Sequence, residues 1–148
     1  MIWRALFVYA HLLAAGLAGG LLLAEYWTLA RPLDRRQLRL LATLDMGYLL
    51  ALIAVVATGL ARASIGAGIQ YYLGNRLFLL KLGILGLVAV AAVAATVRIV
   101  AWSREARVTA FAPLTRDVER LRAVLGLQLG CFALLPLPAV LVSRGFGG

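Results

Sequence analysis

Residues 5–24 read ALFVYAHLLAAGLAGGLLLA, twenty positions among which His11 is the one Asp, Glu, Lys, Arg or His. A helix needs about 20 mainly apolar residues to cross the hydrocarbon core of a bilayer. This stretch therefore predicts a membrane-spanning helix, which we place at about residues 4–30. The rest of the chain is interpreted outward from it.

Three further apolar runs follow, at residues 40–61, 77–97 and 123–142. They predict helices at about 38–62, 76–101 and 117–143. The breaks between the four runs are short, at 31–36, 64–75 and 103–115, and short connections make successive helices antiparallel neighbours. The sequence therefore predicts one transmembrane domain over residues 1–148. Its fold class is all-α, an integral membrane four-helix bundle with antiparallel up-down topology.

Composition points the same way. Of the 148 residues, 64% are hydrophobic and 14% are charged, whereas an average soluble domain has about 45–50% apolar and about 25% charged residues. A disordered chain would instead have low hydrophobicity and high charge. The expected partner of most of the surface is the lipid bilayer.

The charge is strongly positive, with 15 Lys and Arg against 6 Asp and Glu. These cations do not form one stripe interleaved with aromatic residues, so we do not expect nucleic-acid binding. Nine of them lie in or just beyond the first and third breaks, which the positive-inside rule assigns to the cytoplasm: Arg31, Arg35, Arg36, Arg39, Arg104, Arg107, Arg116, Arg120 and Arg122. This count predicts an integral protein of the bacterial inner membrane with both termini outside, in the periplasm.

His11 and Lys81 are the one histidine and the one lysine of the chain, and both fall inside predicted spans at similar depth. Ionisable side chains within a membrane are costly and usually functional. His11 is either a metal or haem ligand or a side chain hydrogen-bonded to a neighbouring helix. Lys81 is either a residue of the same site or a side chain that extends to the nearby membrane surface.

A second ionisable group is expected near the other membrane surface. It consists of Glu25, Asp45, Arg98 and Arg122. One interpretation is a buried ionic network that fixes the helix packing. The alternative is a path for protons or ions.

Small residues and prolines predict details of packing. Gly16 and Gly20 are four residues apart, as are Gly126 and Gly130. This spacing allows helices to approach closely, either within the bundle or across a homodimer interface. Pro136 should kink or end the last helix.

Several short stretches resemble an uncharacterised (DUF-type) family of small four-span predicted membrane proteins. They are YAHLLA at 9–14, LLAEY at 22–26, LARP at 29–32, LDMGY at 44–48, ATGLAR at 57–62 and YYLGNRLFLLKL at 71–82. More remotely, residues 9–13 and 79–82 resemble motifs of the HemJ-type membrane protoporphyrinogen oxidases. That resemblance implies haem b, with His11 as ligand of the haem iron and Lys81 as second site residue. It departs at Leu79, where those proteins have histidine, and at Thr58-Gly59, where they have Pro-Gly.

The leading hypothesis is a membrane haem-binding redox protein, with His11 as axial ligand and Lys81 as second ligand or propionate partner. It would be an oxidoreductase for a porphyrin-like or quinone-type substrate, with a small-molecule redox partner and a homodimeric assembly. One alternative is a small proton- or ion-coupled transporter or channel that uses Glu25 and Asp45. The other is a non-catalytic membrane scaffold.

Overall fold

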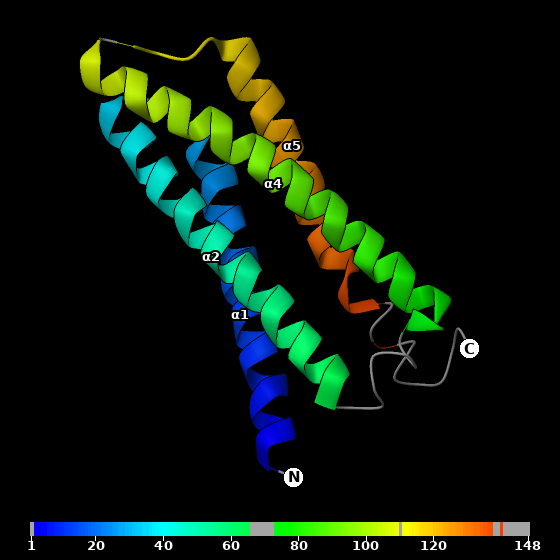
Figure 1. The fold of residues 1–148 in the computed structure, drawn as a ribbon. Coiled ribbons are helices and arrows are strands. Elements are labelled where there is room, and N and C mark those ends of the chain that lie inside the picture. The colour runs from blue at the N-terminus through cyan, green and yellow to red at the C-terminus, as the bar shows by residue number, and fades with distance from the viewer. Residues whose placement is uncertain (1, 66–72, 110, 138–139, 141–148) are drawn as a thin grey trace.

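The computed structural model describes residues 2–65, 73–109, 111–137 and 140. They form four helices, with no strand among these residues: α1 (Ile2–Thr28), α2 (Arg35–Ile65), α4 (Arg76–Val108) and α5 (Thr115–Leu134). The helices run alternately in opposite directions (Figure 1). The predicted all-α, up-down bundle is confirmed.

The four helices close into a ring. α1 packs on α2, α2 on α4, α4 on α5, and α5 returns to pack on α1. The core lies where the four meet, and its most buried apolar side chains come from all four helices: Leu22, Leu41, Tyr48, Ile99 and Leu125. Each helix therefore has one face on this core and leaves its other faces to the surroundings.

The outward faces of the helices are apolar. Leu13, Leu50 and Val90 are 60%, 63% and 71% exposed, and many other large apolar side chains are exposed with them. Soluble monomers rarely expose apolar surface on this scale. Three helices are long and apolar enough to cross a membrane, at Ala5–Thr28, Arg35–Ile65 and Arg76–Val108. The structure thus supports an integral membrane protein.

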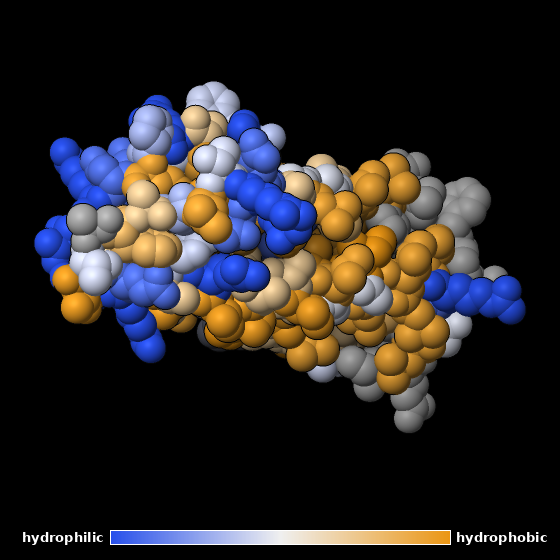
Figure 2. Space-filling view, turned by 90° about the horizontal axis from the view of Figure 1, so that it is seen from above, coloured by the Kyte–Doolittle hydropathy of each residue, from blue (hydrophilic) through white to orange (hydrophobic). Residues whose placement is uncertain are grey.

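Hydrophilic residues gather at one end of the bundle, and hydrophobic residues cover most of the remaining length (Figure 2). This end contains the end of α1, the start of α2, the end of α4 and the start of α5. We call it the arginine-rich end, and we call the opposite end, where α1 begins, the amino-terminal end. The arrangement agrees with the predicted clustering of cations in the first and third breaks. The side of the membrane that each end faces stays a prediction.

Helix boundaries follow local capping and core packing. α2 begins at Arg35, three residues before the predicted start, because the Gln37 backbone N–H donates to Asp34 Oδ1 at 2.7 Å. This side-chain bond satisfies one free amide of the first turn. Asn75 caps α4 in the same way. α4 also continues to Val108, beyond the predicted end at 101, because Trp102 and Ala106 are buried against the core.

The last helix differs most from its prediction. α5 ends at Leu134, followed by a turn at Leu135, and the described residues 136, 137 and 140 are helical again. The helix is thus interrupted beside Pro136, which has no backbone donor. The predicted extension to 143 lies partly outside the described residues. The first turns of α5 carry five charged side chains: Arg116, Asp117, Glu119, Arg120 and Arg122. Among the described residues α5 is therefore not one of the helices that meet the criteria for a membrane span.

The paired glycines do not pack helices together in the way the spacing suggests. A Cβ atom added at Gly16, Gly20 or Gly130 would have nothing within 4 Å, so these positions face open space. Only Gly126 has a neighbour at van der Waals distance, the ring of Tyr26 at 3.4 Å. Close packing within the bundle therefore explains one of the four glycines. The homodimer stays a prediction.

Candidate functional site

His11 is tied to α2 by a hydrogen bond between its side chain and that of Thr58. The distance from His11 Nδ1 to Thr58 Oγ1 is 2.9 Å. The Thr58 hydroxyl has one hydrogen, which it donates to the carbonyl oxygen of Ala54 at 2.6 Å. Its oxygen therefore accepts from His11, which makes Nδ1 the protonated nitrogen of the neutral ring. The backbone of Val55 also forms a hydrogen bond with the ring. In this tautomer the remaining nitrogen, Nε2, keeps its lone pair.

The absence of a side chain at Gly59 gives the His11 ring its place. A Cβ atom at position 59 would lie 3.2 Å from His11 Cε1 and 3.6 Å from Nδ1. The first distance is shorter than ordinary van der Waals contact, so a larger residue would push the ring away from α2. Thr58 and Gly59 thus act together. The Thr58 hydroxyl orients the imidazole, and the absence of a side chain at Gly59 leaves room for it.

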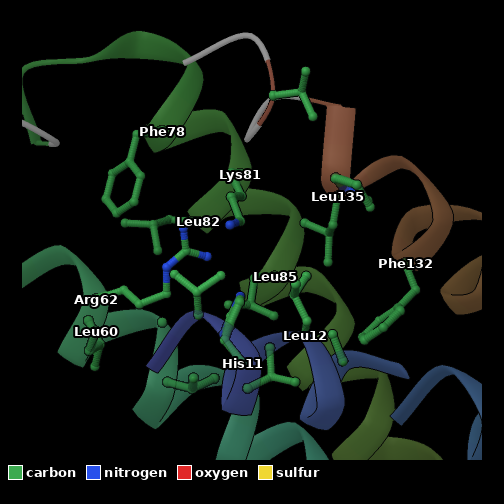
Figure 3. Close-up of a pocket in the computed structure, with 17 residues that line it drawn as sticks. His11, Leu12, Leu60, Arg62, Phe78, Lys81, Leu82, Leu85, Phe132 and Leu135 are labelled. Carbon is green, nitrogen blue, oxygen red and sulfur yellow. The ribbon is translucent and has the colours of Figure 1, made fainter. Parts of the chain in front are cut away.

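Lys81 on α4 and Arg62 on α2 extend toward the same space as His11 (Figure 3). His11 lies close enough to both cations for an electrostatic interaction, and so does Lys81 to Arg62. Between positively charged forms these interactions are repulsive. No ion pair neutralises either cation among the residues the structure describes, where the one pair within 4.0 Å joins Arg120 to Asp117. Three basic groups from three helices therefore meet without a carboxylate between them.

These basic groups line a cavity of about 400 Å³ near the amino-terminal end of the bundle. Its other walls are almost entirely apolar and come from α1, α2, α4, α5 and the segment after α5. They include Leu12, Val55, Leu85, Phe132 and Leu135 (Figure 3). None of the described residues that line it is Asp or Glu. This volume lies within the range of about 300–1,000 Å³ that small-molecule sites occupy.

His11 and Lys81 both line this cavity, and His11 also has a hydrogen bond to a neighbouring helix. The two interpretations of His11 are therefore compatible, because the bond uses Nδ1 and leaves Nε2 available. A ligating histidine usually donates its other ring N–H to a neighbour in this way. Among the described residues no three His, Cys, Asp or Glu side chains converge on a common point. A bare metal ion held by several such side chains is therefore not indicated here.

The second ionisable group lies deeper in the core, toward the arginine-rich end. Glu25 is fully buried and Asp45 is 1% exposed. Asp45 Oδ1 accepts from the Thr96 hydroxyl at 3.0 Å, and Tyr48 Oη donates to Gln128 Oε1 at 3.0 Å. All four helices therefore contribute to this cluster, which we call the carboxylate cluster: Glu25, Asp45, Tyr48, Thr96 and Gln128.

The two arginines of the predicted ionic network do not lie in the carboxylate cluster. Arg98 is exposed. The guanidinium of Arg122 lies over the ring of Tyr26, 4.7 Å from its centre, as in a cation–π contact. Neither arginine pairs with Glu25 or Asp45 within 4.0 Å. The structure therefore brings together the two carboxylates of the expected network but not its cations.

Sequence reasoning missed several residues of both groups. Arg62 occurs in the sequence analysis only as the end of the stretch at 57–62, and Thr58-Gly59 only as a departure from a related motif. The spacing of these residues in the sequence could have indicated a shared face. Residues three or four positions apart lie on one face of a helix, and this holds for Val55, Thr58, Gly59 and Arg62 of α2. Gln128 and Tyr48 are polar residues inside apolar runs, which is a signal of function or of a buried hydrogen bond.

Comparison with known proteins gives one match. The family described as "Predicted membrane protein (DUF2214)" matches residues 3–147, nearly the whole chain. No curated protein matches, and no solved structure does. The likeness to HemJ-type proteins is thus supported only by the short motifs named above. The length of the family match, together with the helical membrane fold, shows that the chain belongs to the DUF2214 family of predicted membrane proteins.

Proposed function

We propose that the cavity binds a largely apolar cofactor that bears carboxylates, that this cofactor is haem b, and that the protein is a membrane redox protein. The observation that carries the proposal is the lining of the cavity. Its walls are apolar, and its polar groups are His11, Arg62 and Lys81, without Asp or Glu among the described lining residues. Such a site favours an anionic amphiphile, because neither Arg62 nor Lys81 has a counter-ion among the described residues.

The arrangement around His11 suits an iron ligand. Neutral imidazole binds metals through a nitrogen lone pair, and the second nitrogen is usually held by an outer hydrogen bond. Thr58 supplies that bond on Nδ1, and Gly59 leaves the ring room against α2. Nε2 is then the nitrogen that would bind the iron.

Lys81 and Arg62 suit the carboxylates of the same cofactor. Both cations lie beside apolar side chains of the cavity wall. Hydrogen bonds between charged partners are stronger than hydrogen bonds between neutral groups. Their place beside each other supports the propionate role for Lys81 over the role of second axial ligand. Haem would supply one-electron chemistry. The chain's own residues would hold it, orient it and exclude water with the apolar walls.

The substrate class and the assembly belong to the same proposal. A porphyrin-like or quinone-type molecule is the substrate that an apolar membrane cavity with a redox cofactor would accept. Since one chain has one histidine, a second histidine ligand could come only from a second copy, which keeps the homodimer in the proposal. The ratio of haem to protein in the purified complex measures this directly: one haem per chain requires no shared ligand, and one per two chains requires it.

The proposal is tested with a matched pair of metal-free probes, protoporphyrin IX and its dimethyl ester. The protein is reconstituted in lipid nanodiscs, and porphyrin fluorescence is titrated against protein-free nanodiscs. We expect the diacid to saturate a site with an affinity at least about tenfold above that of the ester, since one charged hydrogen bond contributes about 1.5–3 kcal/mol. Equal binding of the two probes, or none above the lipid background, would overturn the carboxylate role of the cavity.

The Thr58 hydroxyl is expected to matter through His11. Thr58→Val keeps the shape of the side chain but removes the acceptor for Nδ1–H, whereas Thr58→Ser keeps it. Loss of an outer hydrogen bond to a ligating histidine lowers metal affinity by about 10–100-fold. We expect that loss of haem affinity in Thr58→Val, measured by absorbance titration, and near wild-type affinity in Thr58→Ser. If both variants bind haem alike, Thr58 does not orient a ligand.

A further inference from the structure

The carboxylate cluster holds more unpaired acceptors than its neighbours can satisfy. Both oxygens of Glu25 and Oδ2 of Asp45 are buried without a hydrogen-bond partner. Glu25 lies close enough to Asp45 for an electrostatic interaction between them, and Tyr48 interacts with both. Buried polar atoms are nearly always bonded. These three buried oxygen atoms therefore require a hydrogen-bond donor.

Gln128 gives an independent indication of what that is. This side chain is 1% exposed, and its Nε2 has no hydrogen-bond partner. Its amide is fixed in orientation, because Oε1 accepts from Tyr48, which has an electrostatic interaction with both carboxyl groups. An amide N–H₂ group attracts a carboxyl oxygen but repels a cation. The donor set is thus suited to a proton and not to a metal ion, which would need oxygen ligands only.

The charge of the two carboxyl groups also indicates that a proton occupies the site. Two ionised carboxylates at this depth would carry two negative charges, and an isolated buried charge is strongly unfavourable. The titratable or charged groups of the neighbouring elements do not remove them. On α2 the only such group beside Asp45 is Tyr48, and Arg98 of α4 is exposed. Arg122 of α5 lies over Tyr26 of α1, its buried Nε has no hydrogen-bond partner, and it forms no ion pair with either carboxylate within 4.0 Å. A proton on one carboxyl group halves the charge and turns one orphaned acceptor into a donor.

We propose that Glu25 and Asp45 form a proton-binding site in the membrane, in which Glu25 carries an exchangeable proton beside Asp45, Tyr48 and Gln128. Glu25 is the protonated partner, because Thr96 already donates to Asp45 and no described residue donates to Glu25. When the proton leaves, the O–H bond of Glu25 breaks, the electron pair stays on the carboxylate oxygen, and water takes the proton. A nearby carboxylate disfavours ionisation of a second carboxyl group, which favours a proton on one of the two.

The test uses infrared difference spectroscopy on the full chain in nanodiscs without added cofactor, so its outcome is separate from that of haem binding. We expect the carbonyl band of a protonated carboxylic acid at neutral pH, with a shift on exchange into D₂O. Glu25→Gln should remove the band, and Asp45→Asn should shift it. The matched control Glu119→Gln, at an exposed position of α5, should leave it unchanged.

Thermal unfolding guards against a misfolded variant. Because Glu25→Gln replaces an unpaired acid by an amide of the same size, its unfolding temperature should equal or exceed that of the wild type. Absence of the band in the wild type, or its persistence in Glu25→Gln, would overturn the proposal. Loss of the band on addition of Na⁺ or Ca²⁺ at constant pH would overturn it too, since a cation would then be the occupant.

Discussion

Replacing His11 with alanine is expected to remove the iron-dependent part of cofactor binding and to leave the porphyrin-dependent part intact. The reason is that His11 is the one histidine that lines the cavity, and its Nε2 carries the lone pair that would bind iron. Arg62, Lys81 and the apolar walls, which would bind the porphyrin, remain in the variant. The loss of haem affinity should exceed the about 10–100-fold that follows loss of an outer hydrogen bond. Absorbance titration with haem measures it, and fluorescence titration with metal-free protoporphyrin IX gives the unchanged reference.

Imidazole added to the His11→Ala variant provides the control. The substitution leaves a space beside Gly59 that the free ligand can fill, so imidazole should restore the absorbance spectrum of the wild-type complex. Failure of rescue together with weakened binding of the metal-free porphyrin would mean that the variant disturbs the cavity as a whole. Haem affinity equal to that of the wild type would contradict the assignment of His11 as ligand.

The second large effect is expected from removal of both cations. In the double variant Arg62→Met and Lys81→Met the long side chains and their apolar contacts are retained and the charges are lost. Each charged hydrogen bond contributes about 1.5–3 kcal/mol, equal to about 10–150-fold in affinity. The diacid porphyrin should therefore bind at least about 100-fold more weakly than to the wild type, while the dimethyl ester should bind almost as before.

Arg76→Met is the matched control for this double variant. Arg76 opens α4 at the same end of the bundle and is exposed, but it is not among the residues that line the cavity. It should leave the affinities for both porphyrins unchanged. An equal loss in Arg76→Met would show that general positive charge near the membrane surface, and not the cavity, attracts the diacid.

Much of the fold could be predicted from the sequence because lipid imposes a simple rule. Runs such as residues 5–24 cannot satisfy their backbone in a membrane except as helices, and the observed α1 at Ile2–Thr28 lies close to the predicted 4–30. The end of α4 could not be predicted in this way. Residues 102–108 are polar in part, and it is the burial of Trp102 and Ala106 against the core that extends the helix.

The site was only partly predictable for a related reason. His11 and Lys81 could be singled out because each is unique and lies at membrane depth. That they face one cavity could not be deduced, since a helix that is apolar on all faces gives no direction to its sides. Arg62 had the same residue type as the loop cations, so its role emerged only from its place opposite Lys81. Likewise, Gln128 became significant only when the packing of α5 placed its side chain in hydrogen-bond contact with Tyr48.

The central claim is that the cavity at His11, Arg62 and Lys81 binds haem. Its most direct test is the absorbance spectrum of the wild-type protein in nanodiscs during titration with haem. We predict a saturable Soret band that differs from that of haem in protein-free nanodiscs and changes on reduction with dithionite. A spectrum that stays identical to that of haem in protein-free nanodiscs at every ratio would contradict the account.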